Sequence, residues 1–207
     1  MTRSKLYVIY YSTWGHSRKL AEAIKEEAAK NEEVDVSIWQ VAETINSEIL
    51  NKMHGAPKAD HPIITPNEMV DADAFIFGIP TRYGNMPAQF KILWDATGQL
   101  WAKGQLHGKL GATFFSTSSQ HGGQETTALT FMTTFARHGI IYVPLGYFNV
   151  PHLTNMTEIV GGSAYGAGTL SGGDGSRAVS SKELEIARHQ GREFAKTVAQ
   201  YYRNRKD

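Results

Sequence analysis

Apolar runs alternate with amphipathic segments along almost the whole chain. Five short runs, rich in β-branched and aromatic residues, predict strands. Between them, apolar side chains recur every three or four residues, which is the period of a helix with one buried face. The predicted strands span residues 5–11, 34–39, 73–80, 109–117 and 140–147; the predicted helices span residues 17–31, 46–53, 86–98, 124–138 and the segment from Ser180 onward. This alternation predicts a parallel sheet with helices on both faces.

Five strands of this kind favour an α/β fold of the flavodoxin-like type. It is a doubly wound five-stranded parallel sheet with the strand order 2-1-3-4-5. We expect a single domain over residues 1–207, with insertions near residues 40–70 and 148–180. The second insertion is rich in glycine, and we expect it to be irregular.

Two local signals refine the last elements. Pro144 predicts a bulge or an edge position within the fifth strand, because proline has no N–H for the ladder. Ser180 with Glu183 three residues later matches a capping box, which predicts the start of the last helix.

Three polar loops follow strands whose carboxyl ends meet at one edge of the predicted sheet. They are residues 12–17, 80–85 and 116–123, and all are rich in Gly, Ser, Thr, Asn or Gln. In open α/β sheets, ligands bind beyond this edge, at the point where the strand order reverses. The loops therefore predict a ligand site.

The first loop predicts an anion site. Ser12, Thr13 and Ser17 offer hydroxyls, Gly15 allows close approach of the backbone, and the following helix directs its free N–H groups at the loop. Phosphate is the usual occupant of such a site. The alternative is that Ser17 is a simple N-cap in a turn that binds nothing.

The other two loops predict contacts with a flat heteroaromatic ring. The segment from Thr81 to Asn85 offers a hydroxyl, a cation, an aromatic side chain and backbone amides, and residues 116–123 add hydroxyls and two glycines. Each loop taken alone is also compatible with an ordinary turn. Together with a phosphate site, they predict that flavin mononucleotide (FMN) binds here.

Composition and missing motifs exclude several other classes. The 207 residues include 21 Lys plus Arg and 20 Asp plus Glu, a net charge of +1 that predicts no nucleic-acid partner. There is no cysteine, so thiol chemistry and cysteine-ligated metals are excluded. The nucleotide-binding patterns G-x-x-x-x-G-K-[ST] and G-x-G-x-x-G, the hydrolase elbow G-x-S-x-G and the metal motif H-E-x-x-H are absent from the expected places. We expect no metal, no integral membrane segment and a cytoplasmic location.

Several segments resemble one known family. They are "YYSTWGHSRKLA", "PTRYGNMPAQ", "GGQETT", "HGIIYVPLGY" and "GGDGSR". The chain is similar over nearly its whole length to the Trp-repressor-binding-protein (WrbA-type) family of flavodoxin-like NAD(P)H:quinone oxidoreductases. The resemblance implies bound FMN, NAD(P)H as co-substrate, a quinone as the second substrate and a homo-oligomer, a tetramer in that family.

The resemblance also implies the site residues. The third loop is one residue longer than the family's usual version, so its register between Ser118 and His121 stays open. FMN contacts are implied for Ser12, Thr13, Trp14, Gly15, His16, Ser17, Pro80, Thr81, Arg82, Tyr83, Gly84, Asn85, Ser116, Thr117, Ser118, Ser119, Gln120 and Gly122.

Four implied roles concern the reacting ring and the substrates. Trp14 stands where the family has an aromatic residue near the nicotinamide, and Trp101 is implied as a wall of the substrate pocket, although core packing is the alternative for Trp101. The family has two histidines where this chain has Arg137 and His138. The first is the implied flavin contact, the second is the one candidate for a catalytic group, and which of the two reaches the flavin stays open.

The implied reaction is a ping-pong transfer of a hydride from NAD(P)H to the flavin and of two electrons from the flavin to a quinone. Two alternatives remain. One is a flavodoxin-type one-electron carrier, a class that usually has a strongly acidic face. The other is a flavin-binding scaffold or regulatory protein.

Overall fold

One sheet forms the centre of the molecule. The structure is a computed structural model and describes residues 3–203. Within this range, seven strands form the sheet in the order β2-β1-β3-β4-β7-β6, and β5 pairs with β4 beside this path. The strands are β1 (Ser4–Tyr10), β2 (Val34–Gln40), β3 (Ala74–Pro80), β4 (Leu110–Thr117), β5 (Ile141–Tyr142), β6 (Gly162–Ser163) and β7 (Gly166–Leu170). All pairings are parallel except the one between β6 and β7.

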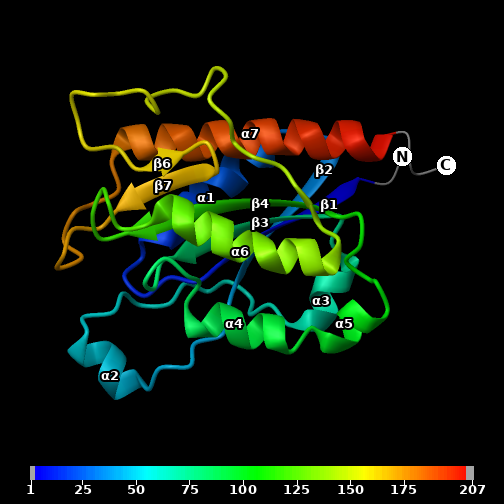
Figure 1. Cartoon of the computed structure of the whole chain (residues 1–207), viewed down its shortest axis with the longest axis horizontal. Coiled ribbons are helices and arrows are strands. Elements are labelled where there is room, and N and C mark those ends of the chain that lie inside the picture. Colours follow the sequence, from blue (N-terminus) through cyan, green and yellow to red (C-terminus); the bar gives the residue numbers. More distant parts are fainter. Residues whose placement is uncertain (1–2, 204–207) are drawn as a thin grey trace.

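Helices cover both faces of this sheet (Figure 1). Helices α1 and α7 pack on one face, while α4 and α6 pack on the other. The helices are α1 (His16–Ala28), α2 (Ser47–Lys52), α3 (Pro66–Asp71), α4 (Ala88–Asp95), α5 (Gly98–Ala102), α6 (Gln124–His138) and α7 (Ser181–Arg203). Two apolar cores result, one on each face. Every residue of β3 and β4 is buried, as expected for strands covered on both sides.

The fifth strand differs from the prediction. Residues 140–147 were expected to form it, but β5 has two residues and pairs only with Leu110 and Gly111 at the start of β4. The N–H of Val143 still donates to the carbonyl of Gly111 (2.8 Å). Pro144 has no N–H to continue this pairing, and the chain leaves the sheet there.

The second half of β4 pairs with β7 instead. Phe115, Ser116 and Thr117 lie opposite Gly168, Thr169 and Leu170. The insertion near residues 148–180, expected to be irregular, therefore supplies a strand of the sheet. Its glycines allow this, since a Cβ on Gly166 would lie 1.9 Å from the carbonyl oxygen of Thr113.

Two helical predictions also need correction. The helix expected over residues 86–98 is divided into α4 and α5, because the hydroxyl of Thr97 bonds to the carbonyl of Trp94 (2.6 Å) where the first helix ends. Helix α3 begins at a capping box formed by Thr65 and Glu68, and it was not predicted. In contrast, α6 has the predicted bounds, and α7 begins one residue after Ser180.

Among the described helices, none has the length and apolarity that crossing a membrane requires.

Candidate ligand site at the carboxyl edge of the sheet

The three polar loops meet around one cavity at the carboxyl edge of the sheet. Its volume is about 260 Å³. The lining comes from the ends of β1, β3 and β4, and from one residue after β7. The lining residues are Ser12, Thr13, Trp14, His16, Pro80, Thr81, Arg82, Ser116, Thr117, Ser118 and Ser171. All of them except Ser171 were predicted from the sequence.

The first loop presents the uncapped start of helix α1. Gly15 is the N-cap residue, with a φ of 91°, and among the described residues no side-chain cap bond forms at the first turn. The hydroxyl of Ser12 accepts from the N–H of Gly15 itself (3.0 Å). Ser17 is fully buried, and its hydroxyl shares a hydrogen bond with that of Ser116 (2.9 Å). The alternative in which Ser17 caps this helix is therefore wrong. The free N–H groups and the positive end of the helix dipole remain available to an anion.

The second loop is a tight turn with a fixed shape. The N–H of Arg82 donates to the carbonyl of Asn85 (2.7 Å), and the N–H of Asn85 donates back (3.0 Å). The two central residues, Tyr83 and Gly84, have φ angles of 55° and 79°, the signs that a type I′ turn requires. The ring of Tyr83 is fully exposed at the tip.

This turn contacts the first half of helix α6. The hydroxyl of Thr130 donates to the carbonyl of Gly84 (2.9 Å), and that of Thr127 donates to the hydroxyl of Thr81 (2.7 Å). Arg82 turns back toward the first loop, where its guanidinium contacts the hydroxyl of Thr13 (3.3 Å) and lies 5.7 Å from the ring centre of Trp14. The second loop thus places the guanidinium of Arg82, which is flat and positively charged, beside the cavity.

The third loop divides between two surfaces. Ser118 faces the 260 Å³ cavity, whereas Gln120 and His121 line a separate groove beside β6. Gly122 allows the loop to turn, since a Cβ there would lie 2.8 Å from the Cβ of Thr117. Flavin contacts by Ser119, Gln120 and Gly122 stay predictions.

A clasp that the sequence pattern did not predict holds the first loop from outside. We use this name for residues 53–58. The indole N–H of Trp14 donates to the carbonyl of Met53 (2.9 Å), and the N–H of Ala56 donates to the carbonyl of Thr13 (2.8 Å). Lys58 donates to the carbonyl of Ser12 (3.0 Å). No sequence signal pointed to this contact, because it joins segments about forty residues apart whose pairing depends on the fold.

Glu43 anchors the clasp through Lys58. The two side chains form an ion pair of 2.6 Å, and the phenol of Tyr11 donates to the same carboxylate (2.9 Å). Burial alone would raise the pKa of Glu43, but the bonds from Lys58, the N–H of Ile45 and Tyr11 outweigh it and lower this pKa. Burial raises the pKa of Tyr11 to about 12, so this phenol stays a donor at neutral pH.

Three residues with predicted roles lie away from this cavity. Arg137 and His138 end helix α6, whose fifteen residues run about 22 Å from the third loop toward the opposite edge of the sheet. Helix α5, which carries Trp101, lies near that opposite edge (Figure 1). The side chain of Trp101 is 60% exposed, so the core-packing alternative is wrong for it. Within one chain, none of the three lines the cavity.

His138 is instead part of a local contact. Its Nε2 shares a hydrogen bond with the hydroxyl of Thr97 (3.0 Å), and its ring centre lies 5.4 Å from that of Trp94. Its Nδ1 is buried without a partner among the described residues. Burial lowers the pKa of His138. No group of three or more His, Asp or Glu side chains comes together as a metal site anywhere in the described range.

Comparison with known proteins identifies the family. The model of the NADPH-dependent FMN reductase family matches residues 5–155, which is more than half of the chain. The chain belongs to this family. It is 53% identical over 188 residues to the quinone-oxidoreductase QR2 of Triphysaria versicolor, covering 91% of this chain and 92% of that protein. It is 47% identical over 203 residues to the NAD(P)H quinone oxidoreductase PST2 of Candida albicans, covering 97% and 99%.

Solved structures confirm the fold. A flavodoxin, WrbA-like protein from Agrobacterium tumefaciens superposes with a TM-score of 0.65 at 23% identity, covering 95% of this chain and 98% of that one. An archaeal flavodoxin superposes with a TM-score of 0.57 at 19% identity, covering 94% and 98%. The predicted flavodoxin-like fold is therefore correct, and within the sheet the arrangement after β4 differs from the prediction.

Proposed function

We propose that this protein binds FMN in the cavity at the carboxyl edge of the sheet and reduces quinones with NAD(P)H. The observation that carries the proposal is the uncapped start of helix α1, which faces a set of hydroxyls in a chain of the FMN reductase family. Two relatives of about 50% identity are named quinone oxidoreductases. We also place the chain with the WrbA-type enzymes, on the motifs that it shares with them.

The residues of the cavity fit a phosphate ester. The free N–H groups of α1 and the hydroxyls of Ser12 and Thr13 are donors, and no carboxylate of the described residues lines the cavity. A ligand with one phosphate therefore meets donors without a repelling charge. Ser116, Thr117 and Ser118 extend the polar lining along the end of β4.

When bound, FMN would supply the transfer of a hydride from NAD(P)H and of two electrons to a quinone, and the quinone would take up two protons and leave as hydroquinone. The chain contributes positions and charge to this reaction. Arg82 places a fixed positive charge beside the cavity, which favours the negative charge that reduction adds. Trp14 is 36% exposed, and its ring offers an apolar face to flat substrates.

The proposal includes a tetramer, as the WrbA-type resemblance implies. Trp101 and Arg137 lie at the far edge of the sheet, so they can reach a cavity of this kind only in a second copy of the chain. Large exposed apolar side chains support association, among them Phe148, Met156 and Trp101. Sedimentation at several protein concentrations tests this part.

A cytoplasmic location is also proposed, because NAD(P)H is supplied inside cells. Cell fractionation tests this location.

A spectral titration tests the central claim. Purified protein is supplied with FMN under anaerobic conditions, and NADPH is then added. We expect the flavin absorbance to bleach with one equivalent and to return when benzoquinone is added. Steady-state rates at several fixed quinone concentrations should give parallel double-reciprocal lines, the pattern of a ping-pong reaction. FMN binding without oxidation of NADPH would favour the one-electron carrier, and failure to bind FMN would reject both.

Replacing Arg82 tests the wall of the cavity. Arg82→Ala removes a cation that contacts the first loop, so we expect lower FMN content or slower turnover. Arg188→Ala is the matched control, since Arg188 lies on α7 and pairs with Glu26 away from the cavity. Unchanged flavin content together with unchanged turnover in Arg82→Ala would remove Arg82 from the proposal.

A further inference from the structure

A buried carboxylate holds the glycine-rich segment that follows β7. Glu183, in the first turn of α7, is 0% exposed. Its oxygens accept from the N–H groups of Gly161 (3.1 Å), Leu170 (3.3 Å) and Ser180 (2.8 Å), and from the hydroxyl of Thr169 (2.9 Å). The capping box explains only the bond from Ser180. The remaining donors belong to the sheet and to the insertion, so this carboxylate has a second role.

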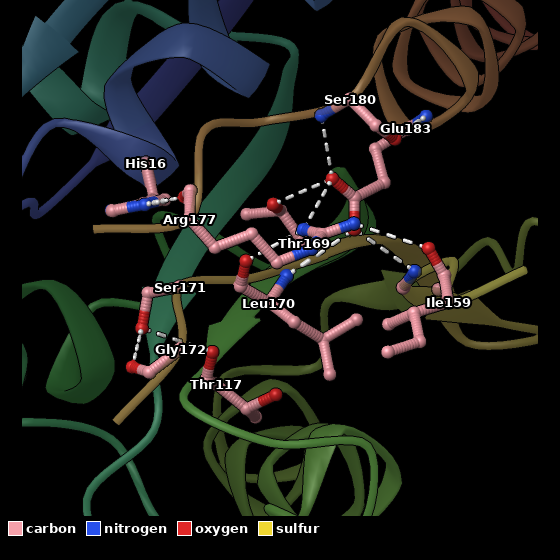
Figure 2. Close-up of polar contacts among 12 residues, drawn as sticks. His16, Thr117, Ile159, Thr169, Leu170, Ser171, Gly172, Arg177, Ser180 and Glu183 are labelled. Atoms are coloured by element: carbon pink, nitrogen blue, oxygen red, sulfur yellow. Dashed lines mark hydrogen bonds and ion pairs between the residues drawn. The ribbon is translucent and has the colours of Figure 1, made fainter. Parts of the chain in front are cut away.

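Arg177 neutralises this carboxylate and ties it to the insertion (Figure 2). Its Nη1 lies 3.0 Å from both oxygens of Glu183 and also donates to the carbonyl of Leu170 (2.7 Å). Its Nη2 donates to the carbonyl of Ile159 (3.1 Å). One guanidinium therefore joins the start of α7, the end of β7 and the long loop before β6.

The segment from Ser171 to Arg177 forms a closed loop on this anchor. The N–H of Arg177 donates to the carbonyl of Ser171 (2.9 Å), and the N–H of Gly175 donates to the carbonyl of Gly172 (3.2 Å). At the tip, Asp174 accepts from the N–H of Ser176 (3.1 Å) and from its hydroxyl (2.8 Å). These bonds give a glycine-rich segment a defined shape.

This loop contacts the FMN cavity at three places. Ser171 lines the cavity, and its N–H and hydroxyl both donate to the carbonyl of Thr117 (2.8 and 3.3 Å). A Cβ on Gly175 would lie 3.6 Å from the ring of Trp14. The carbonyl of Arg177 accepts from Nε2 of His16 (2.8 Å), and His16 is buried at the start of α1 (Figure 2).

The bond to His16 requires a proton on Nε2 of its imidazole. Because a carbonyl can only accept, Nε2 carries the proton. Nδ1 has no partner among the described residues, so it is the ring nitrogen left for a ligand in the cavity. If the carbonyl of Arg177 were displaced, Nε2 of His16 would no longer be required to carry a proton.

We propose that residues 171–177 form the fourth wall of the FMN site and that Arg177 is the positioning residue that holds this wall and, through its carbonyl, His16. The inference rests on the proposed function for the identity of the ligand. The side chain of Arg177 does not face FMN in this proposal. It acts by pairing with Glu183, which keeps the loop against the first loop and α1.

Binding and imidazole measurements on the apoprotein test this role. We compare the wild type with Arg177→Met and use Arg203→Met as the matched control, since Arg203 also makes two bonds to a glutamate, Glu33. FMN is titrated by quenching of its fluorescence, and the Nε2–H signal of His16 is followed by 15N NMR. We expect Arg177→Met to raise the FMN dissociation constant about tenfold and to lose the His16 signal, and Arg203→Met to change neither. A folded Arg177→Met protein with wild-type FMN affinity and an unchanged His16 signal would overturn the proposal.

A second variant guards against loss of the fold. Arg177→Met leaves a charge buried without its partner, which destabilises proteins strongly. Arg177→Lys keeps the charge for Glu183, but one ammonium cannot also reach the carbonyls of both Leu170 and Ile159. We expect it to fold, to bind FMN with intermediate affinity, and to exchange the amide hydrogens of Gly175 and Arg177 faster than the wild type. Wild-type affinity with wild-type exchange would contradict the positioning role.

Different results would reject the proposed function and the positioning role of Arg177. If the wild type does not bind FMN, the proposed function fails. The His16 signal and the amide exchange of residues 171–177 still report on the apoprotein, and they decide whether Arg177 holds the wall.

Discussion

At the scale of single residues, the first loop owes its shape to side chains that do not line the cavity. Lys58 donates to the carbonyl of Ser12 and pairs with Glu43, which also accepts from Tyr11. None of these bonds was visible in the sequence, because Glu43 and Lys58 lie in an insertion whose path the hydrophobic pattern does not determine. The hydroxyls and Gly15 of the first loop were predictable, since their chemistry is local to a strand-to-helix turn.

Removing Lys58 tests the clasp. Lys58→Met deletes one hydrogen bond to the first loop, so we expect the dissociation constant for FMN to rise by about two- to fivefold. Lys52→Met is the control, because Lys52 pairs with Glu48 on the exposed face of α2. Titration of the apoproteins with FMN measures the effect. Equal affinities in both variants would show that the clasp does not position the loop.

His138 predicts a pH dependence of stability. Burial lowers its pKa below the usual 6.5, so the unfolded chain binds a proton more readily than the folded protein. Unfolding takes up a proton in the window just below pH 6.5, and stability therefore falls as the pH falls through this window. His189 adds in the same direction, because burial and then Arg192 lower its pKa.

Urea unfolding at pH 7.5 and pH 5.5 checks this prediction. We expect His138→Gln to lose less stability between the two pH values than the wild type does, because one titrating group is gone. His121→Gln, on an exposed loop, should behave as the wild type. The same pH dependence in all three proteins would exclude His138 as a source.

At the scale of elements, the sequence predicted helices whose bounds depend on neighbouring residues along the chain. The apolar period predicted α6 with its bounds, and Ser180 with Glu183 predicted the start of α7. The fifth strand could not be predicted in this way. The second half of β4 pairs with residues about fifty positions along the chain, and that pairing depends on a glycine-rich segment with little strand propensity of its own.

Gly166 tests this pairing. A Cβ there would lie 1.9 Å from a backbone oxygen of β4, so Gly166→Ala must separate β7 from β4. We expect a loss of about 3 kcal/mol or more in the free energy of unfolding. Gly173→Ala in the same insertion is the control, since its Cβ would meet nothing within 4 Å. Urea unfolding at neutral pH measures both, and a loss below about 1 kcal/mol in Gly166→Ala would contradict the observed pairing.

At the scale of the whole molecule, the cavity exists only in the folded chain. Its walls come from segments between Ser12 and Ser171, which only the assembled sheet brings together. A ligand of this cavity therefore binds the folded state and not the unfolded one. Such a ligand stabilises the fold by an amount set by its concentration relative to its dissociation constant.

Thermal unfolding with and without FMN measures this stabilisation of the folded state. At a free concentration one hundred times the dissociation constant, FMN should add about 2.7 kcal/mol of stability. For a chain of this length, that corresponds to a rise of roughly 5–10 °C in Tm. Riboflavin at the same concentration should produce a smaller rise, because it lacks the phosphate that the start of α1 is proposed to hold. Equal shifts for the two ligands would mean that the helix start does not bind the phosphate, even though the flavin ring binds.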